Sequence, residues 1–249
     1  MSSIINGICL HGGLRAIGST FLAFSDYLKS AIRLAAISKI PSINIFSHDS
    51  ITVGEDGPTH QPIEQINSLR LIPNHYLFRP YNFIETLESF KFAFNSSQTP
   101  VTMITSRGDF LQVNNIKNID ISKGAYIFQD NRKYMVTILA TGSEVALAIS
   151  VSKILSSKKV FSRIISVPCL ELFNEQPQDF KNKILGKKLV VSIEYGSTRL
   201  WENISDVQFG INVFGKSGKA NDIIKCFKLD DISISKAILE KLNRKKNVK

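Results

Sequence analysis

The sequence predicts an α/β protein made of two consecutive domains, each a mostly parallel sheet flanked by helices. Short apolar runs alternate with longer stretches whose apolar residues recur at helical spacing, which is typical of strand-helix-strand units. The alternation is lost across residues 108–123, which are polar and rich in asparagine, and then resumes. With 249 residues, the chain is long enough for two domains. We expect domains at residues 1–110 and 124–249, joined by a linker at 111–123.

The first domain is predicted to contain a helix that begins at Ser19 or Thr20 and continues to about Lys39. Either hydroxyl can cap the helix, and a proline soon after Lys39 ends it. Asn82, followed three residues later by Glu85, predicts the start of another helix. The remaining elements are expected as a strand at 43–46, a helix at 62–71, a strand at 76–78, a helix at 82–94 and a strand at 101–105.

The second domain repeats the same kind of pattern. Its expected elements are strands at 135–140, 160–167, 189–193 and 207–213 and helices at 143–156 and 232–243. Thr141-Gly142-Ser143 opens the first of these helices, where backbone amides could hold an anion. A single glycine is weak support for such a site, so a simple capped turn is the favoured interpretation.

Composition excludes several classes of protein. The chain is 43% hydrophobic and has no run of eighteen apolar residues, so no membrane span is expected. Its amino terminus lacks the basic and apolar regions of a secretory leader. The three cysteines, Cys9, Cys169 and Cys226, fit no metal or redox spacing and suit a reducing compartment. We therefore expect a cytoplasmic protein.

The net charge of +10 belongs entirely to the second half of the chain. Residues 1–115 hold 8 basic and 8 acidic side chains, whereas residues 116–249 hold 23 and 13. The last nine residues carry five cations and no acid, which is typical of a solvated helix end and tail. A basic module that binds nucleic acid is the sharper alternative. It is disfavoured because interleaved aromatic residues and a known motif are absent.

The most unusual stretch is the loop at residues 47–61. It holds two of the four histidines, His48 and His60, and three carboxylates between them. Such a strand-to-helix loop lies at the carboxyl ends of parallel strands, where open α/β sheets bind ligands. A polar turn that satisfies backbone groups is the plainest interpretation. A metal site is disfavoured, because the two histidines lack a recognised ligand spacing and no cysteine joins them.

A family resemblance gives this loop a third interpretation. The pattern H-D-S-x-x-x-G-E-D-G-P-T-H-Q-P-x-E-Q at 48–65 resembles the signature of transketolases, which transfer two-carbon units between sugar phosphates with thiamine diphosphate. The resemblance extends to N-G-I-C-L-H-G-G at 6–13, S-T-F-L-A-F at 19–24 and S-R at 106–107. It continues more weakly through T-G-S-E and F-G-K-S to the end of the chain. The chain is similar to most of the pyrimidine-binding domain plus the carboxyl-terminal domain.

The resemblance implies roles for three aromatic residues and one histidine. Phe21, Phe24 and Tyr27 match the aromatic residues around the cofactor's aminopyrimidine. Without the resemblance, their i, i+3, i+6 spacing would predict a stripe of core residues. His60 matches the histidine beside the cofactor's amino group, where a titrating imidazole can relay protons, so it is the candidate catalytic residue.

Three further residues are implied to contact the substrate. His48 and Arg107 match the contacts to the substrate phosphate, a dianion that needs cationic or N–H donors. Asp56 matches the carboxylate that accepts a hydrogen bond from a substrate hydroxyl. The loop F-G-K-S-G-K at 214–219 departs from the family, because it lacks the Ala-Pro pair that ends the corresponding family motif.

Some of the family's machinery is missing from this sequence. The glutamate that protonates the cofactor's pyrimidine would lie immediately upstream of Met1. The ligands of its diphosphate and of Mg or Ca belong to a further amino-terminal domain, and no metal ligands are assigned here. We therefore expect a partner, either an amino-terminal transketolase section or a second subunit, with the active site between subunits of a dimer. The alternatives are an inactive remnant of a split transketolase gene and a basic interaction module.

Overall fold

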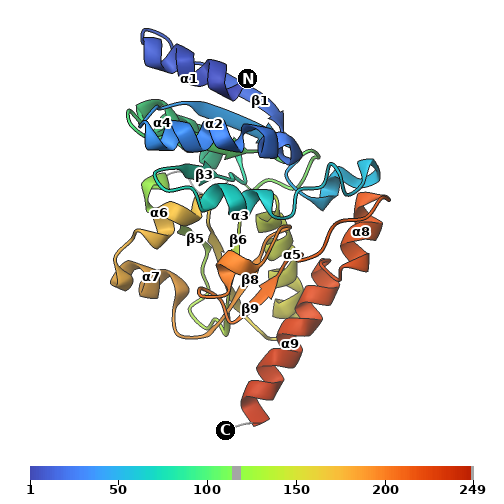
Figure 1. Cartoon of the computed structure of the whole chain (residues 1–249). Coiled ribbons are helices and arrows are strands. Elements are labelled where there is room, and N and C mark those ends of the chain that lie inside the picture. The colour runs from blue at the N-terminus through green and yellow to red at the C-terminus, as the bar shows by residue number, and fades with distance from the viewer. Residues whose placement is uncertain (114–118, 248–249) are drawn as a thin grey trace.

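The computed structural model describes residues 1–113 and 119–247 and forms two sheets (Figure 1). The first sheet has the strand order β1-β2-β4-β3 and is parallel throughout. The second has the order β5-β7-β6-β8-β9, in which only the edge strand β5 is antiparallel to its neighbour. Helices flank both sheets. This confirms the predicted α/β class with two mostly parallel sheets.

The first sheet and its helices comprise α1 (Ser2–His11), β1 (Ile17–Phe21), α2 (Ser25–Ile37), β2 (Ile43–Ser47), α3 (Gln65–Arg70), β3 (Tyr76–Phe78), α4 (Phe83–Asn95) and β4 (Val101–Ile104). The second comprises β5 (Tyr126–Gln129), β6 (Val136–Ala140), α5 (Glu144–Ser157), β7 (Ser162–Ser166), α6 (Leu170–Asn174), α7 (Gln178–Leu185), β8 (Leu189–Ile193), β9 (Val207–Phe209), α8 (Ala220–Cys226) and α9 (Asp231–Asn247).

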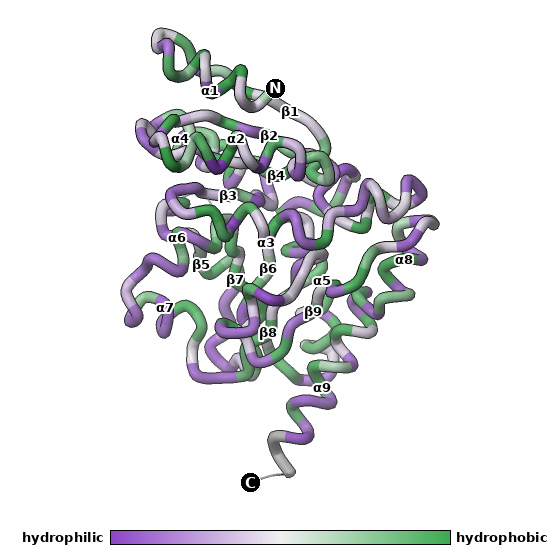
Figure 2. The backbone as a smooth tube through the Cα atoms, in the orientation of Figure 1, coloured by the Kyte–Doolittle hydropathy of each residue, from purple (hydrophilic) through white to green (hydrophobic). Residues whose placement is uncertain are grey.

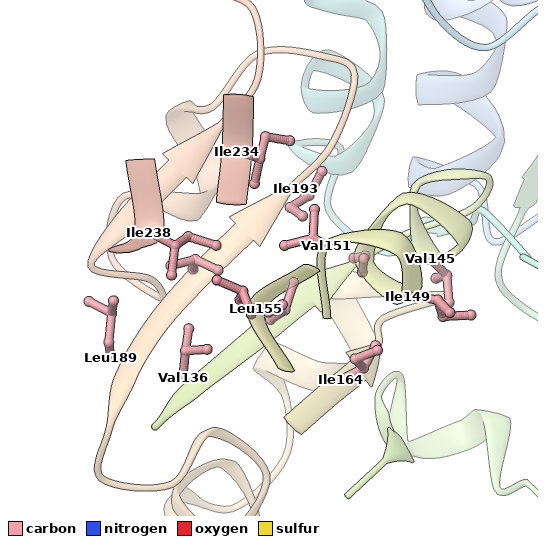
Figure 3. Packing of buried hydrophobic residues seen from close by; sticks show 14 of the residues in the cluster. Val136, Val145, Ile149, Val151, Leu155, Ile164, Leu189, Ile193, Ile234 and Ile238 are labelled. Atoms are coloured by element: carbon pink, nitrogen blue, oxygen red, sulfur yellow. The ribbon is translucent and has the colours of Figure 1, made fainter. Parts of the chain in front are cut away.

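The central strands are buried on both faces, as parallel strands require. All five residues of β6 are buried, and so are all five of β8. Side chains of these strands pack against α5 and α9 in the core cluster of Figure 3, where Val151 and Ile193 lie close to Ile234. The near-continuous apolar runs that predicted these strands therefore form the centre of the second sheet.

The start of α4 follows its local sequence. The backbone N–H of Glu85 donates to Asn82 Oδ1 at 3.0 Å, and the extended Asn82 is the N-cap. The Glu85 carboxylate turns back to accept from the N–H of Tyr81 at 2.7 Å. The predicted cap pair is confirmed, because a short polar side chain satisfies an amide that the helix itself leaves unpaired.

The predicted helix start at Ser19 or Thr20 is wrong. Both residues lie in β1, where Ser19 pairs with Ile45 and Thr20 with Phe46 of β2. The helix α2 begins only at Ser25. Pairing with a buried neighbour strand outweighs the capping preference of the two hydroxyl residues, since a β-branched threonine also suits a strand.

Several short elements were not predicted, namely α1, β5, α6, α7 and α8. Their hydrophobic periodicity is too short to separate helix from strand. Helix α9 continues to Asn247, beyond the predicted end. Residues 114–118 of the predicted linker and residues 248–249 of the basic tail lie outside the described part of the chain. Within that described part, no helix is long and apolar enough to cross a membrane.

The end of the molecule formed by α1 and β1 exposes many apolar side chains. Strand β1 is an edge strand that pairs only with β2. Figure 1 places α1 and β1 on the side of the first sheet away from the second sheet, and Figure 2 shows hydrophobic segments along α1. The exposed apolar residues of this end are Met1, Ile4, Leu10, Leu14 and Ile17, and Leu34 and Ile37 of α2 are exposed as well.

Candidate functional site

The carboxyl ends of β1 and β2 bring Phe21 and His48 together. Phe21 pairs with Ser47 at the end of the strands, and His48 follows directly. The Phe21 and His48 rings stack with their centroids 3.6 Å apart. His48 has φ 61°, a left-handed conformation that few residues other than glycine adopt, and such backbone clusters at functional sites. Its Nδ1 lies 2.9 Å from Ser47 Oγ, which orients the imidazole.

A layer of aromatic rings extends from this pair. Phe24 lies parallel to Phe21 with centroids 6.1 Å apart, and His60 meets Phe24 edge-on at 5.5 Å. Tyr27 lies 6.4 Å from Phe24 and is 83% exposed. The structure thus brings all three predicted aromatic residues together, but on the end of β1, a short 3-10 helix and the first turn of α2 rather than on one helix. The exposure of Tyr27 excludes the interpretation of the three residues as a stripe of core side chains.

A cavity of about 360 Å³ opens against this aromatic layer. Phe24 and Tyr27 line it from the first half of the chain, and Phe214 lines it from the second. Gln61 and Gln65 add polar groups. The carboxylates of Asp26 and Glu64 line it as well. Rings together with amide and carboxylate acceptors around a space of this size fit a flat heteroaromatic group with N–H donors, such as an aminopyrimidine.

His60 is held so that one ring nitrogen remains available. Its Nδ1 lies 2.9 Å from Thr59 Oγ1, and Nε2 has no hydrogen bond among the residues that the structure describes. A ring nitrogen without a protein partner can form a hydrogen bond with a bound group. The position of His60 at the edge of Phe24 therefore suits a proton relay beside a ring bound in the cavity.

Two of the predicted substrate residues line a second cavity. Asp56 and Arg107 are both exposed and line one cavity of about 270 Å³. Burial lowers the pKa of His48, and the positive charge of Arg107 lowers it further, while Asp56 and Asp49 act in the opposite direction. His48 therefore remains largely neutral at pH 7. The three residues form one electrostatic group around the carboxyl ends of β2 and β4.

The second half of the chain holds the signature loop in place. Gln61 Nε2 donates to the carbonyls of Gly54 and Lys216, both at 2.8 Å, and the Lys216 N–H donates to Gln61 Oε1 at 3.0 Å. Ser217 Oγ donates to the carbonyl of Glu55 at 2.7 Å. The 214–219 loop therefore contacts residues 54–61 through backbone and side chain alike.

A buried ionic cluster joins the two sheets and was not predicted. Arg79, fully buried at the end of β3, donates from Nε and Nη2 to Asp49 Oδ2 at 3.1 and 2.7 Å. Its Nη1 donates to Thr141 Oγ1 at 2.8 Å and to the Glu144 carboxylate. Burial opposes the charge of Arg79, but Glu144 and Asp49 together raise its pKa, so it stays cationic. Asp49 directly follows His48, so this cluster also supports the site.

The Thr141-Gly142-Ser143 turn is part of this cluster, so its interpretation as an anion site is wrong. The turn receives the guanidinium of Arg79, and the N–H of Gly142 donates to the Arg79 carbonyl at 2.9 Å. Gly142 has φ 51°, and a Cβ there would lie 2.8 Å from Arg79 Cγ. In the sequence, the resemblance of T-G-S-E to the family motif pointed to this turn. No motif pointed to Arg79.

A second buried arginine completes the joint between the sheets. Arg70 Nη1 and Nη2 donate to the two carboxylate oxygens of Glu194 at 2.8 and 2.9 Å. Trp201 Nε1 donates to the same carboxylate at 2.8 Å. Burial alone would raise the pKa of Glu194, but the Arg70 pair outweighs it and lowers that pKa to about 2. Among the described residues, no group of three or more His, Cys, Asp or Glu side chains is placed to hold a metal ion.

The chain thus consists of two α/β units, and the first carries an aromatic layer and two histidines at the carboxyl ends of its strands. The family model of the transketolase pyrimidine-binding domain matches residues 1–111, and that of the transketolase-like carboxyl-terminal domain matches residues 124–230. The chain belongs to the transketolase family.

Individual relatives agree with the family models. The transketolase of Buchnera aphidicola is 40% identical over 250 residues, covering 97% of this chain and 38% of the relative. That of Cereibacter sphaeroides is 37% identical, again covering 97% of this chain and 38% of the relative. This chain thus spans less than two fifths of the length of these relatives.

Solved structures give the same result. The Pichia stipitis transketolase in complex with sedoheptulose 7-phosphate superposes with a TM-score of 0.94 at 36% identity, over 99% of this chain and 37% of that one. A split-gene transketolase, described as an inactive β4 tetramer, superposes with a TM-score of 0.78 at 18% identity, over 96% of this chain and 80% of that one. The second match shows the shared fold.

Proposed function

We propose that this chain forms the pyrimidine-facing and substrate-facing part of a thiamine diphosphate-dependent transketolase, which transfers a two-carbon ketol unit between sugar phosphates. The observation that supports this most is the stacked layer of Phe21, Phe24 and His48, with His60 at its edge, beside a cavity of suitable size. In this role the chain works in the pentose phosphate pathway of the cytoplasm.

The residues around the two cavities have separate tasks in this proposal. Phe21, Phe24 and Tyr27 provide the apolar surroundings of the aminopyrimidine, and His60 relays a proton beside it. Bound there, thiamine diphosphate would supply the nucleophilic carbon that carries the two-carbon unit. Arg107 and the neutral His48 hold the substrate phosphate with charge and an N–H donor. Asp56 accepts a hydrogen bond from a substrate hydroxyl and so selects its configuration.

Activity requires a partner in this proposal, either an amino-terminal transketolase section or a second subunit. The relatives with this activity in their names are more than twice as long as the matched segment. The exposed apolar surface of α1 and the unpaired edge of β1 are a suitable contact area for further protein. The partner would contribute the ligands of the diphosphate and of Mg or Ca, and the complete enzyme would be a dimer with its active site between subunits.

We also propose that the chain is divided into a domain at residues 1–110, a linker and a domain at residues 124–249. The solved split-gene relative gives a precedent at the level of fold, because its chain is covered to 80% by this pair of units. A partner chain would then complete the assembly in trans. An inactive remnant would keep the fold and the aromatic layer but would find no such partner.

The test is an activity measurement on the complex that the chain forms in its own cells. The tagged chain is purified under mild conditions, supplied with thiamine diphosphate and magnesium, and assayed for ketol transfer between sugar phosphates. We expect activity in the wild-type eluate and at least a hundredfold less with His60→Ala, since general acid–base groups contribute about 10²–10⁴ in rate. Equal activity from the two eluates, or none from either, would contradict the proposal.

A further inference from the structure

The cavity beside Asp56 and Arg107 has a wall from the second half of the chain. Lys219 and Ala220 line it together with residues 52–56 and Arg107. It thus contains two cationic side chains, Arg107 and Lys219, and two carboxylates, Glu55 and Asp56. A space lined by both signs of charge suits a ligand with an anionic group and several hydroxyls, because cations bind the former and carboxylates accept from the latter.

The backbone around Lys219 is fixed against the signature loop. Ser217 Oγ donates to the Glu55 carbonyl at 2.7 Å, two residues before Lys219. On the other side, a Cβ added to Gly54 would lie 3.3 Å from the Gly218 carbonyl and 3.5 Å from the Ala220 nitrogen. Only a residue without a side chain permits this approach at φ 80°. Lys219 is therefore presented to the cavity by a close contact between backbones.

Within residues 1–113 and 119–247, Lys219 and Arg107 are not held in ion pairs, although Glu55 and Asp56 line the same cavity. Neither side chain forms an ion pair or hydrogen bond within the part of the chain that the structure describes. The nearby Lys216 points elsewhere, because its Nζ lies 3.2 Å from Cys226 Sγ and over the Phe227 ring. Both cations at the cavity are thus available for an anion from solution.

We propose that Lys219 is a second cation of the phosphate subsite and binds, together with Arg107, the phosphate group of the sugar phosphate. This inference rests on the function proposed above and adds a contact from the second half of the chain. Lys219 is the last residue of the 214–219 loop, which contacts the signature loop through Ser217 and Lys216. Two cations bind a dianion more strongly than one cation does. Lys219 would then be one basic residue of the second half with a binding role.

The test is a titration of the full chain with inorganic phosphate, followed by phosphorus NMR at low ionic strength. Lys219→Ala is compared with Lys225→Ala, which removes the same charge from an exposed residue of α8 outside this cavity. We expect Lys219→Ala to weaken phosphate binding about three- to tenfold, the range for one charge-assisted contact at a partly exposed site. Lys225→Ala should change it less than about twofold, and Lys219→Arg should retain most of the affinity.

An Arg107→Ala variant separates this inference from the proposed function. If Arg107→Ala weakens binding while Lys219→Ala behaves like Lys225→Ala, the phosphate contact of the proposed function stands and the role of Lys219 is refuted. If the wild-type chain shows no saturable phosphate binding, the phosphate subsite is refuted. The proposed function is tested separately by the ketol-transfer assay. Parallel losses in Lys219→Ala and Arg107→Ala support a shared site.

Discussion

The two sheets meet through the carboxyl ends of their strands, yet they use these ends differently. In the first sheet the ends of β1, β2 and β4 carry accessible site residues, among them Phe21, His48 and Arg107. In the second sheet the ends of β6 and β8 carry the buried Thr141 and Glu194, which bind arginines of the first sheet. The first sheet therefore presents the candidate chemistry, and the second holds the loops in position.

The sheets also differ in how completely they are covered. The core of the second sheet is closed by α5 and α9 (Figure 3), whereas β1 and α1 leave apolar side chains exposed. Parallel sheets depend on burial of both faces, so the first sheet depends more on its neighbours. We therefore expect that removing contacts between the two halves destabilises the first sheet more than the second.

The largest expected effect is that of cutting the chain between the halves. A fragment of residues 1–113 loses Glu194, which pairs with Arg70, and Glu144, which pairs with Arg79 together with the retained Asp49. We expect it to show no sharp cooperative thermal transition, while a fragment of residues 119–249 still unfolds cooperatively. Circular dichroism melting curves of both fragments check this. A sharp transition of the first fragment alone would show that the first sheet needs no support.

Removing the central arginine is the next largest effect. Arg79→Met leaves Asp49 and Glu144 buried without their cation, and breaking a buried pair costs about 3–5 kcal/mol. The matched control is Arg163→Met, which breaks the partly exposed pair with Asp130 and should cost less than about 1 kcal/mol. Urea unfolding of the three proteins measures both values. If both variants lost a similar amount of unfolding free energy, the buried cluster would contribute no more to stability than the partly exposed pair.

A pH effect comes third and concerns the first sheet alone. Burial lowers the pKa of His75 to about 4, and its ring hydrogen-bonds to Leu69 and Thr102 as a neutral imidazole. The unfolded chain binds a proton near pH 6.5, so stability falls as the pH drops from about 6.5 to 4, on the order of 3 kcal/mol in total.

Variants isolate this contribution from that of other titrating groups. Between pH 6.5 and 4, the free energy of unfolding should fall less in His75→Gln than in the wild type, because the variant lacks the titrating imidazole. In His11→Gln, which changes an exposed histidine, it should fall as much as in the wild type. Denaturant unfolding at a series of pH values gives the comparison. An unchanged pH dependence in His75→Gln would contradict the neutral buried state of this imidazole.

The smallest effect is expected from the contact between the loops. Gln61→Ala removes two hydrogen bonds to Lys216 and one to the carbonyl of Gly54, and should cost about 1–3 kcal/mol. Gln178→Ala, on the surface of α7, is the control with a near-zero effect. Hydrogen exchange should accelerate in residues 51–61 and 214–219 of the first variant only. Unchanged exchange there would mean that these loops are held by other contacts.

Sequence reasoning succeeded where one local pattern decided the structure. The apolar runs of β2, β6 and β8 and the Asn82 cap needed no distant contact. It failed at β1, where pairing with β2 overrides the local helix signal. It also missed Arg79, because the partners of this residue lie 30 and 65 positions away and no motif encodes that distance.

The central claim is that this chain is one part of a larger thiamine diphosphate enzyme. Native mass spectrometry of the chain isolated from its own cells, with thiamine diphosphate and magnesium present, tests it most directly. We expect an assembly that contains this chain, a complementary transketolase section or second subunit, and bound cofactor. Recovery of only the 27.8 kDa chain without cofactor would contradict it and would identify the aromatic layer as the remnant of a site that is no longer completed.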